Sequence, residues 1–240
     1  MISIQHLSKK FADFLAVDDL NLVVPDGKIY GLLGPNGAGK STTLKMMTGI
    51  LSPTSGDVYY DNLSITKDAL EVKKHFAFNP DSPDMFLGMK GVDYLVFIGS
   101  LFDMSAQEAL SKAEYFAKEL GIYDVLSDYI INYSHGMRQK IFLVSSLMRN
   151  PDCWILDEPL TGLDPESAFK VKNMMREHAN RGHVVLLSTH VLDVAEKLVD
   201  MIGIINKGKL IFSGTIAELK EKRKEENSSL EQLFLELTQK

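Results

Sequence analysis

The sequence predicts an α/β fold with a small antiparallel β part and an inserted helical part. Residues 1 to about 80 alternate short apolar runs with turns, and residues 84–148 place apolar side chains three and four positions apart. Two uninterrupted apolar runs follow, at 153–156 and 184–187. The first pattern is typical of strands and the second of helices. Uninterrupted apolar runs indicate parallel strands that are buried on both faces.

Length and composition fit one large globular domain or two small ones, and we assign a single domain over residues 1–240. The chain is 45% hydrophobic and 24% charged, which is enough apolar material for a sizeable core and excludes fibrous and disordered classes. Its 26 basic and 32 acidic residues give a formal net charge of −6. Because nucleic-acid phosphates are held mainly by clustered Lys and Arg, we expect no nucleic-acid partner.

Cysteine usage and hydropathy indicate a reducing compartment and a chain that does not itself enter a membrane. Cys153 is the single cysteine and lies in an apolar run, so we expect a buried thiol and no internal disulfide. The N-terminus lacks the apolar core of a signal peptide, and no uncharged apolar stretch approaches the roughly 18 residues that span a bilayer. Any membrane role is therefore expected to come through a partner.

The first 80 residues are expected to hold short strands around one helix. The helix begins near Ser41 and ends at Gly49, with Pro53 beyond it. The expected strands cover residues 2–6, 20–24, 28–33 and 58–60. This arrangement indicates a mixed β region.

The rest of the chain is expected to contain an inserted helical subdomain, further strands and a helical tail. The insert covers about 84–148, and its helical spacing is clearest at Ala109, Ala113, Phe116, Ala117 and Leu120. Beyond the two apolar runs and a helix at 165–180, a hairpin is expected at 202–212 with its turn at Lys207-Gly208. The tail, about 218–240, carries an apolar stripe at Leu230, Leu233, Phe234 and Leu237. We expect this stripe to pack on the body of the protein, with a partner contact as the alternative.

A phosphate-binding loop is predicted between the strand at 28–33 and the following helix. The segment matches the pattern G-x-x-x-x-G-K-[ST] and reads Gly34-Pro35-Asn36-Gly37-Ala38-Gly39-Lys40-Ser41, with Thr42 next on the helix. Glycines let backbone N–H groups surround a phosphate, Lys40 can reach the β and γ oxygens, and the Ser41 hydroxyl can bind Mg²⁺. A tight glycine-rich turn is the alternative. The motif predicts a P-loop NTPase core.

A second element of such a core follows the apolar run at 153–156. Asp157 is expected to orient Mg²⁺, and Glu158 to accept a proton from an attacking water. Taken alone, two acids after an apolar strand are usually a strand that meets solvent. Their pairing with a P-loop favours the functional interpretation.

With these motifs, five further segments resemble the ATP-binding subunits of ABC transporters over nearly the whole chain. Tyr133 to Lys140 is similar to the signature loop, Leu163-Asp164 to the D-loop, and His190 to the switch histidine. Phe11 resembles the aromatic that stacks on adenine, and the segment around Asp81 resembles the Q-loop. This order, with a helical insert between P-loop and signature, separates the family from P-loop kinases and GTPases.

The signature segment can open a helix whose N-terminus presents donors to an anion. Ser134 and the Gly136 amide are the residues expected to do so, and a simple helix cap is the alternative. The resemblance implies that they contact the γ-phosphate of the other subunit in a head-to-tail dimer around two ATP molecules. Tyr133, His135 and Met137 replace the usual Leu, Gly and Gln of this loop.

Three other residues are expected at the site, and for two of them a simpler role is left open. His190 follows a strand end, where ligands bind in open α/β sheets, whereas Phe11 could equally belong to the core. Asp81 stands where the family has Gln or sometimes Glu. It could serve Mg²⁺ through a water, or it could cap the turn from Pro80 to Asp84.

The resemblance implies a subunit that binds ATP with Mg²⁺ and hydrolyses it to power a separate membrane permease, at the cytoplasmic face of the cell membrane. The partner would be a second copy or another ABC subunit. The short segment after the cassette favours an exporter over importers with an added regulatory domain. A soluble ABC ATPase of translation or DNA repair is one alternative, which the single P-loop and the lack of a long heptad run disfavour. An ATP-binding regulatory module with little turnover is the other, and the altered signature is consistent with it.

Overall fold

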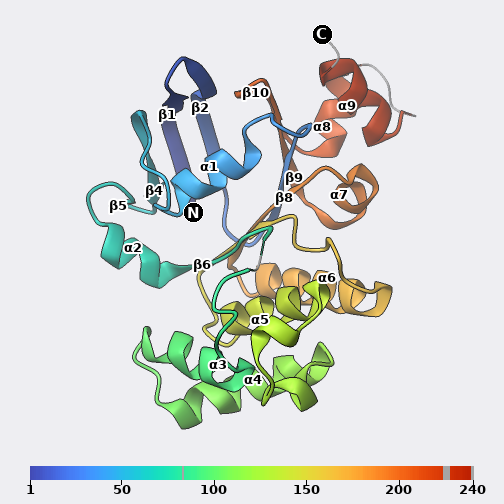
Figure 1. The fold of residues 1–240 in the computed structure, drawn as a ribbon. Coiled ribbons are helices and arrows are strands. Elements are labelled where there is room, and N and C mark those ends of the chain that lie inside the picture. The colour runs from blue at the N-terminus through green and yellow to red at the C-terminus, as the bar shows by residue number, and fades with distance from the viewer. Residues whose placement is uncertain (83, 224–227, 239–240) are drawn as a thin grey trace.

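The computed structural model describes residues 1–82, 84–223 and 228–238, which form two β-sheets surrounded by helices (Figure 1). The antiparallel sheet has the order β2-β1-β4-β5. Its strands are β1 (Ile2–Phe11), β2 (Phe14–Val24), β4 (Ser55–Tyr60) and β5 (Leu63–Ser64). Within the described ranges, no helix has both the length and the apolar composition that crossing a bilayer requires.

The larger sheet has six strands in the order β10-β9-β3-β8-β7-β6. Its strands are β3 (Ile29–Leu33), β6 (Phe76–Asn79), β7 (Cys153–Asp157), β8 (Val184–Thr189), β9 (Met201–Asn206) and β10 (Lys209–Gly214). Neighbours from β9 to β6 pair in parallel, and β10 pairs antiparallel with β9. The predicted α/β class, the antiparallel part and the turn at Lys207-Gly208 are confirmed.

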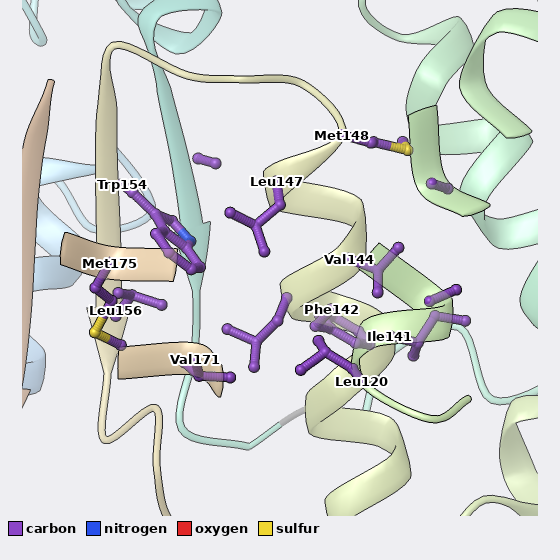
Figure 2. Close-up of a cluster of buried hydrophobic side chains, with 14 of the residues drawn as sticks. Leu120, Ile141, Phe142, Val144, Leu147, Met148, Trp154, Leu156, Val171 and Met175 are labelled. Atoms are coloured by element: carbon purple, nitrogen blue, oxygen red, sulfur yellow. The ribbon is translucent and has the colours of Figure 1, made fainter. Parts of the chain in front are cut away.

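The two apolar runs are buried on both faces because alternate residues enter different cores. In β7, Ile155 packs with α1 (Lys40–Met47) and the antiparallel sheet, whereas Trp154 and Leu156 pack with the helices on the other face. Figure 2 shows this second core, where Trp154 and Leu156 lie near Leu147 of one helix and Met175 of another. The prediction of doubly buried parallel strands is confirmed. Cys153 is buried as expected, and burial raises the pKa of its thiol to about 12.

The helices of the predicted insert share this second core with the sheet. They are α3 (Gly91–Ser100), α4 (Ala106–Glu119), two short 3₁₀ helices at Tyr123–Val125 and Ile130–Asn132, and α5 (His135–Leu147). The long helix α6 (Pro165–Asn180) lies beside them (Figure 1). Ile141, Val144 and Leu147 of α5 pack with Val171 and Met175 of α6.

The tail packs on the body, as predicted. Helices α7 (Leu192–Leu198), α8 (Ile216–Arg223) and α9 (Leu230–Thr238) cover the β9 side of the sheet (Figure 1). Leu230 and Leu233 are fully buried against Leu33 and Ile202. Residues 224–227 and 239–240 of the predicted tail lie outside the described residues.

Two expectations for the first 80 residues are wrong. A second helix, α2 (Ala69–His75), is present, and it buries only Val72, so its apolar pattern is weak. The strand β6 was not predicted, and it belongs with β3 to the large sheet, whereas the other strands of this region form the antiparallel sheet. Strands β1 and β2 are also longer than predicted and continue to the hairpin end at Phe11 and Phe14, because strand pairing extends over half-exposed residues.

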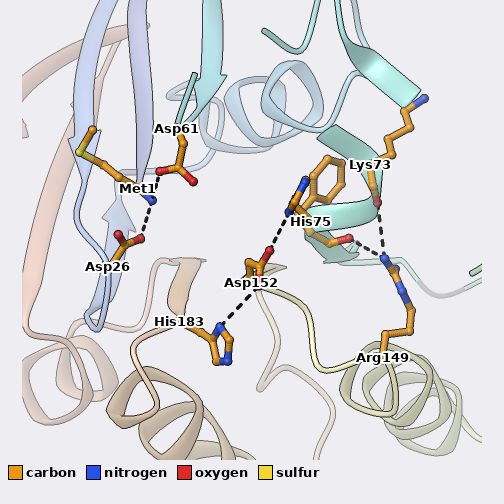
Figure 3. A network of polar contacts seen from close by, with 9 residues as sticks. Met1, Asp26, Asp61, Lys73, His75, Arg149, Asp152 and His183 are labelled. Atoms are coloured by element: carbon orange, nitrogen blue, oxygen red, sulfur yellow. Dashed lines mark hydrogen bonds and ion pairs between the residues drawn. The ribbon is translucent and has the colours of Figure 1, made fainter. Parts of the chain in front are cut away.

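A polar network ties the amino ends of three parallel strands together (Figure 3). The Asp152 carboxylate lies 2.7 Å from His75 Nδ1 and 3.9 Å from His183 Nδ1. These residues directly precede β7, β6 and β8. Arg149 donates to the Phe76 carbonyl at 2.9 Å in the same network. The P-loop and the acidic residues Asp157 and Glu158 lie at the opposite, carboxyl ends of the strands.

Candidate functional site

A cavity of about 560 Å³ lies at the carboxyl ends of the parallel strands, where the P-loop joins β3 to α1. It is lined by Phe11, Phe14, Ala16, Asn36, Gly37, Ala38, Gly39, Lys40, Ser41, Thr42, Asp81, Glu158, Thr161 and His190. Residues predicted from segments nearly 180 positions apart therefore meet around one space. Its place at the strand ends is where ligands bind in open α/β sheets.

The P-loop backbone requires glycine at two positions. Gly39 has φ of +110° and caps α1, and a Cβ there would lie 2.7 Å from the Ala16 carbonyl oxygen. A Cβ on Gly34 would lie 2.5 Å from the Ile205 carbonyl oxygen. No side chain caps the start of α1, so its first N–H groups and the helix dipole favour an anion in the cavity.

Lys40 points back into the loop that would hold the phosphates. Its side chain is buried, and Nζ donates to the Gly34 carbonyl at 2.7 Å and lies 3.3 Å from the Pro35 carbonyl. Burial lowers the pKa of Lys40, and the charges of Glu158 and Asp157 oppose that shift. The ammonium group is thus a donor already bonded to weak carbonyl acceptors. Phosphate oxygens would be stronger ones.

Asp157 and Glu158 have different surroundings although they are adjacent. Asp157 is buried, and Ser188 Oγ of the neighbouring strand β8 donates to its Oδ1. Glu158 has φ of +49°, a left-handed conformation that is uncommon for a non-glycine residue, and this turns its side chain toward the cavity. His190 Nδ1 lies 2.9 Å from Glu158 Oε1. One carboxylate is held inside the protein, and the other faces the ligand space.

The donors here fit Mg²⁺ bound together with a nucleotide. Among the described residues, no three Asp, Glu, His or Cys side chains are arranged to hold a metal on their own. Mg²⁺ usually takes one or two protein oxygens and completes its shell with phosphates and waters. The Ser41 hydroxyl and the Asp157 carboxylate are hard oxygen donors of that kind.

Asp81 and Phe11 line the cavity. The structure does not show the simpler role left open for each, which was turn capping for Asp81 and core packing for Phe11. Asp81 makes no hydrogen bond or ion pair within the described part of the chain, so the turn-capping role is not seen; Pro83 of that turn lies outside the described residues. Phe11 is 45% exposed and does not belong to the core. Lys9 Nζ lies 5.2 Å from the centroid of its ring.

Gly34, Pro35 and Asp157 adjoin the lining residues but do not themselves line the cavity. Three predicted nucleotide contacts from other segments also lie outside it. Ser134 Oγ caps α5 by accepting from the Met137 N–H at 3.2 Å, and Gly136 packs against the Gly162 carbonyl. Asp164 caps α6 by accepting from the Ser167 N–H at 2.8 Å. The helix-cap alternative that was left open for the signature segment is therefore present in Ser134, and Asp164 is a helix cap as well.

Sequence reasoning missed four residues of the site. Phe14, Ala16 and Thr161 line the cavity, and Ser188 holds Asp157. Phe14 pairs with Phe11 across the β1–β2 hairpin. A predicted turn at Ala12-Asp13 would have placed the two aromatic rings together, since hairpin partners share one end of the ladder.

Comparison with known proteins decides the family. The sequence pattern of ABC transporters matches residues 17–161, which is more than half of the chain and includes the P-loop and Glu158. The chain belongs to the ABC transporter family. It is therefore an ATP-binding cassette.

Relatives of this ABC cassette carry ATP-binding names. It is 36% identical to the daunorubicin/doxorubicin resistance ATP-binding protein DrrA of Streptomyces peucetius, with 91% of this chain and 66% of that protein covered. It is 33% identical to the probable multidrug ABC transporter ATP-binding protein YbhF of Escherichia coli K12, with 99% of this chain and 41% of that protein covered. The chain thus spans about two thirds or less of these relatives. A solved ATP-binding subunit of an ABC transporter matches with a TM-score of 0.94 at 28% identity, over 99% of both chains.

Proposed function

We propose that this chain is the ATP-hydrolysing subunit of an ABC exporter and that it powers a separate membrane permease. The observation that carries the proposal is the cavity in which Lys40 and Ser41 of the P-loop face the bonded pair Glu158 and His190. The drug-resistance and multidrug names of two relatives support export. The chain would lie at the cytoplasmic face of the membrane, bound through the permease.

The proposed binding roles follow from the lining of the cavity and from the P-loop and Asp157 beside it. Phe11 would stack on adenine, the backbone of residues 34–39 with Thr42 would surround the phosphates, and Lys40 would neutralise the β and γ oxygens. Ser41 and Asp157 would hold Mg²⁺, with Asp81 acting through a water. The metal would neutralise developing charge on the phosphates.

In the proposed hydrolysis, the Glu158 carboxylate accepts a proton from water as the water oxygen bonds to the γ-phosphorus. The bond from that phosphorus to the β–γ bridging oxygen breaks, which leaves ADP and inorganic phosphate. His190 binds Glu158 Oε1 and fixes the direction of the carboxylate. Lys40 would stabilise the charge on the leaving group.

A second subunit completes the proposed site. Ser134, Gly136 and Asp164 would face the ATP of a partner, either a second copy or another ABC subunit, in a head-to-tail dimer. Each chain would be a single ABC ATPase domain over residues 1–240, with about 84–148 inserted and about 218–240 as its tail. Ser134, Gly136 and Asp164 lie outside the cavity of their own chain, and this position supports the head-to-tail arrangement.

The test is ATP turnover by the purified chain, with and without membranes that hold the permease with which it purifies. We expect Mg²⁺-dependent hydrolysis that the permease changes, and none in Lys40→Ala, which loses the charge facing the β and γ oxygens. Thermal unfolding of Lys40→Ala provides the folding control. Unchanged nucleotide affinity and turnover in that variant would contradict the P-loop assignment. ATP binding without turnover in the parent would favour a regulatory module.

A further inference from the structure

The loop between Glu158 and α6 is anchored at its far end by the signature helix α5. Asp164, the last residue of this loop, accepts from Lys140 Nζ of α5 at 2.9 Å. The Lys140 side chain is 13% exposed and the Asp164 side chain is 51% exposed, so the lysine end of this pair is shielded from solvent. The bond from Lys140, with further bonds from Ser167, lowers the pKa of Asp164.

The near end of the loop contains the residue whose backbone most needs support. Glu158 has φ of +49°, and such a conformation persists in a non-glycine residue only where its surroundings hold it. The Glu158 N–H donates to the Ser188 carbonyl at 3.2 Å, and the Glu158 carbonyl accepts from the Thr161 N–H at 3.2 Å. The second bond makes the position of Glu158 depend on the loop that follows it.

The middle of the loop lies directly against the first turn of α5. A Cβ on Gly162 would lie 2.5 Å from His135 Cδ2, and a Cβ on Gly136 would lie 2.6 Å from the Gly162 carbonyl oxygen. Gln139 Nε2 lies 3.5 Å from the Pro159 carbonyl oxygen, and Gln139 is buried. Because packed segments move as units, a shift of α5 relative to Asp164 would reach Glu158 through five intervening residues.

We infer that Lys140 is a positioning residue for Glu158. Its bond to Asp164 fixes the loop 159–164 against α5, and the loop holds the Glu158 carboxylate beside His190 at the distance that the structure shows. This inference rests on the proposed role of Glu158 in hydrolysis. Lys140 itself lies outside the cavity and is not expected to touch ATP.

The test compares steady-state ATP hydrolysis in Lys140→Met, Asp164→Asn and the double variant. Asn is a good helix cap, so Asp164→Asn removes the charge while keeping an acceptor for the Ser167 N–H. We expect each single variant to lower kcat about tenfold while KM for ATP stays within about twofold, since a displaced catalytic group costs rate and not binding. The double variant should be no slower than the slower single one, because both changes remove the same bond.

Two controls make the result specific. Lys140→Arg should restore most of kcat, because guanidinium can also bind the Asp164 carboxylate. Lys112→Met removes a lysine of another ion pair, 2.7 Å from Glu108 on α4, and it should leave kcat unchanged. If Lys140→Met misfolds on heating, Lys140→Gln carries the test, since Asp164 is itself proposed to face the partner's ATP.

The inference is overturned if both single variants keep the parent kcat, if their effects multiply, or if KM rises in place of a fall in kcat. Glu158→Gln is measured in parallel. Residual hydrolysis at the parent rate in Glu158→Gln would overturn the proposed role of Glu158 itself. An inactive Glu158→Gln with a fully active Lys140→Met would overturn only the positioning role.

Discussion

Replacing Ser188 by alanine should destabilise the chain more than the loss of an ordinary hydroxyl. Ser188 is fully buried, and its Oγ donates to the Asp157 carboxylate, which is 3% exposed. A hydrogen bond to a charged group contributes about 1.5–3 kcal/mol, and its removal leaves a buried carboxylate short of a donor. Alanine creates almost no cavity, and the Glu158 N–H keeps the Ser188 carbonyl as an acceptor. We therefore expect a loss of about 2 kcal/mol.

The assay is urea unfolding without Mg²⁺ or nucleotide, followed by fluorescence of Trp154, the single tryptophan of the chain. In a thermal unfolding experiment on a chain of this size, the same loss of about 2 kcal/mol would lower Tm by roughly 4–8 °C. Thr48→Val is the matched control, because buried Thr48 Oγ1 donates to the neutral Leu44 carbonyl. It should lose no more than about 1 kcal/mol. An equal loss in the two variants would refute the argument from the buried charge.

Two further predictions concern coupling and acid stability. Asp81→Ala should leave ATP affinity nearly unchanged but weaken the coupling of hydrolysis to transport in reconstituted membranes. The reason is that Asp81 lines the cavity without a hydrogen bond or ion pair to any described residue. Full coupling in that variant would contradict a role for Asp81 in the site. Burial lowers the pKa of His178 from 6.5 to about 4, so only the unfolded chain takes up this proton between those values. The free energy of unfolding should fall by up to about 3 kcal/mol as pH drops from 6.5 to 4. His178→Phe should flatten that part of the pH profile, and an unchanged profile would contradict the assignment.

The P-loop and the acidic pair were predictable because each is a short continuous segment with its own chemistry. Gly34 to Ser41 specifies a backbone path, and Asp157 and Glu158 follow an apolar run that is typical of a buried strand. The same local logic predicted the β9–β10 hairpin from Lys207-Gly208. In each case the signal and the structure lie within about ten residues.

What sequence reasoning missed depends on pairing between distant segments. Ser188 meets Asp157 because β7 and β8 pair in the register that places these two residues side by side. Thr161 reaches the cavity because Glu158 turns the chain, and β6 is a strand because a sheet edge is available to pair with Phe76 to Asn79. The periodicity of a single sequence does not show which residues of two distant strands pair with each other. A four-residue run such as β6 is also too short to be distinguished from a loop.

The central claim, a composite site that hydrolyses ATP between two subunits, is tested most directly by Glu158→Gln. The amide cannot accept the proton of the attacking water, so the variant should bind Mg-ATP, fail to hydrolyse it and accumulate as a dimer. Light scattering after size-exclusion chromatography with Mg-ATP measures the mass, and the ADP released measures turnover. A nucleotide-free monomer is compatible with the account, since the interface needs ATP. A variant that stays monomeric with ATP at high protein concentration, or that still releases ADP at the parent rate, would contradict it.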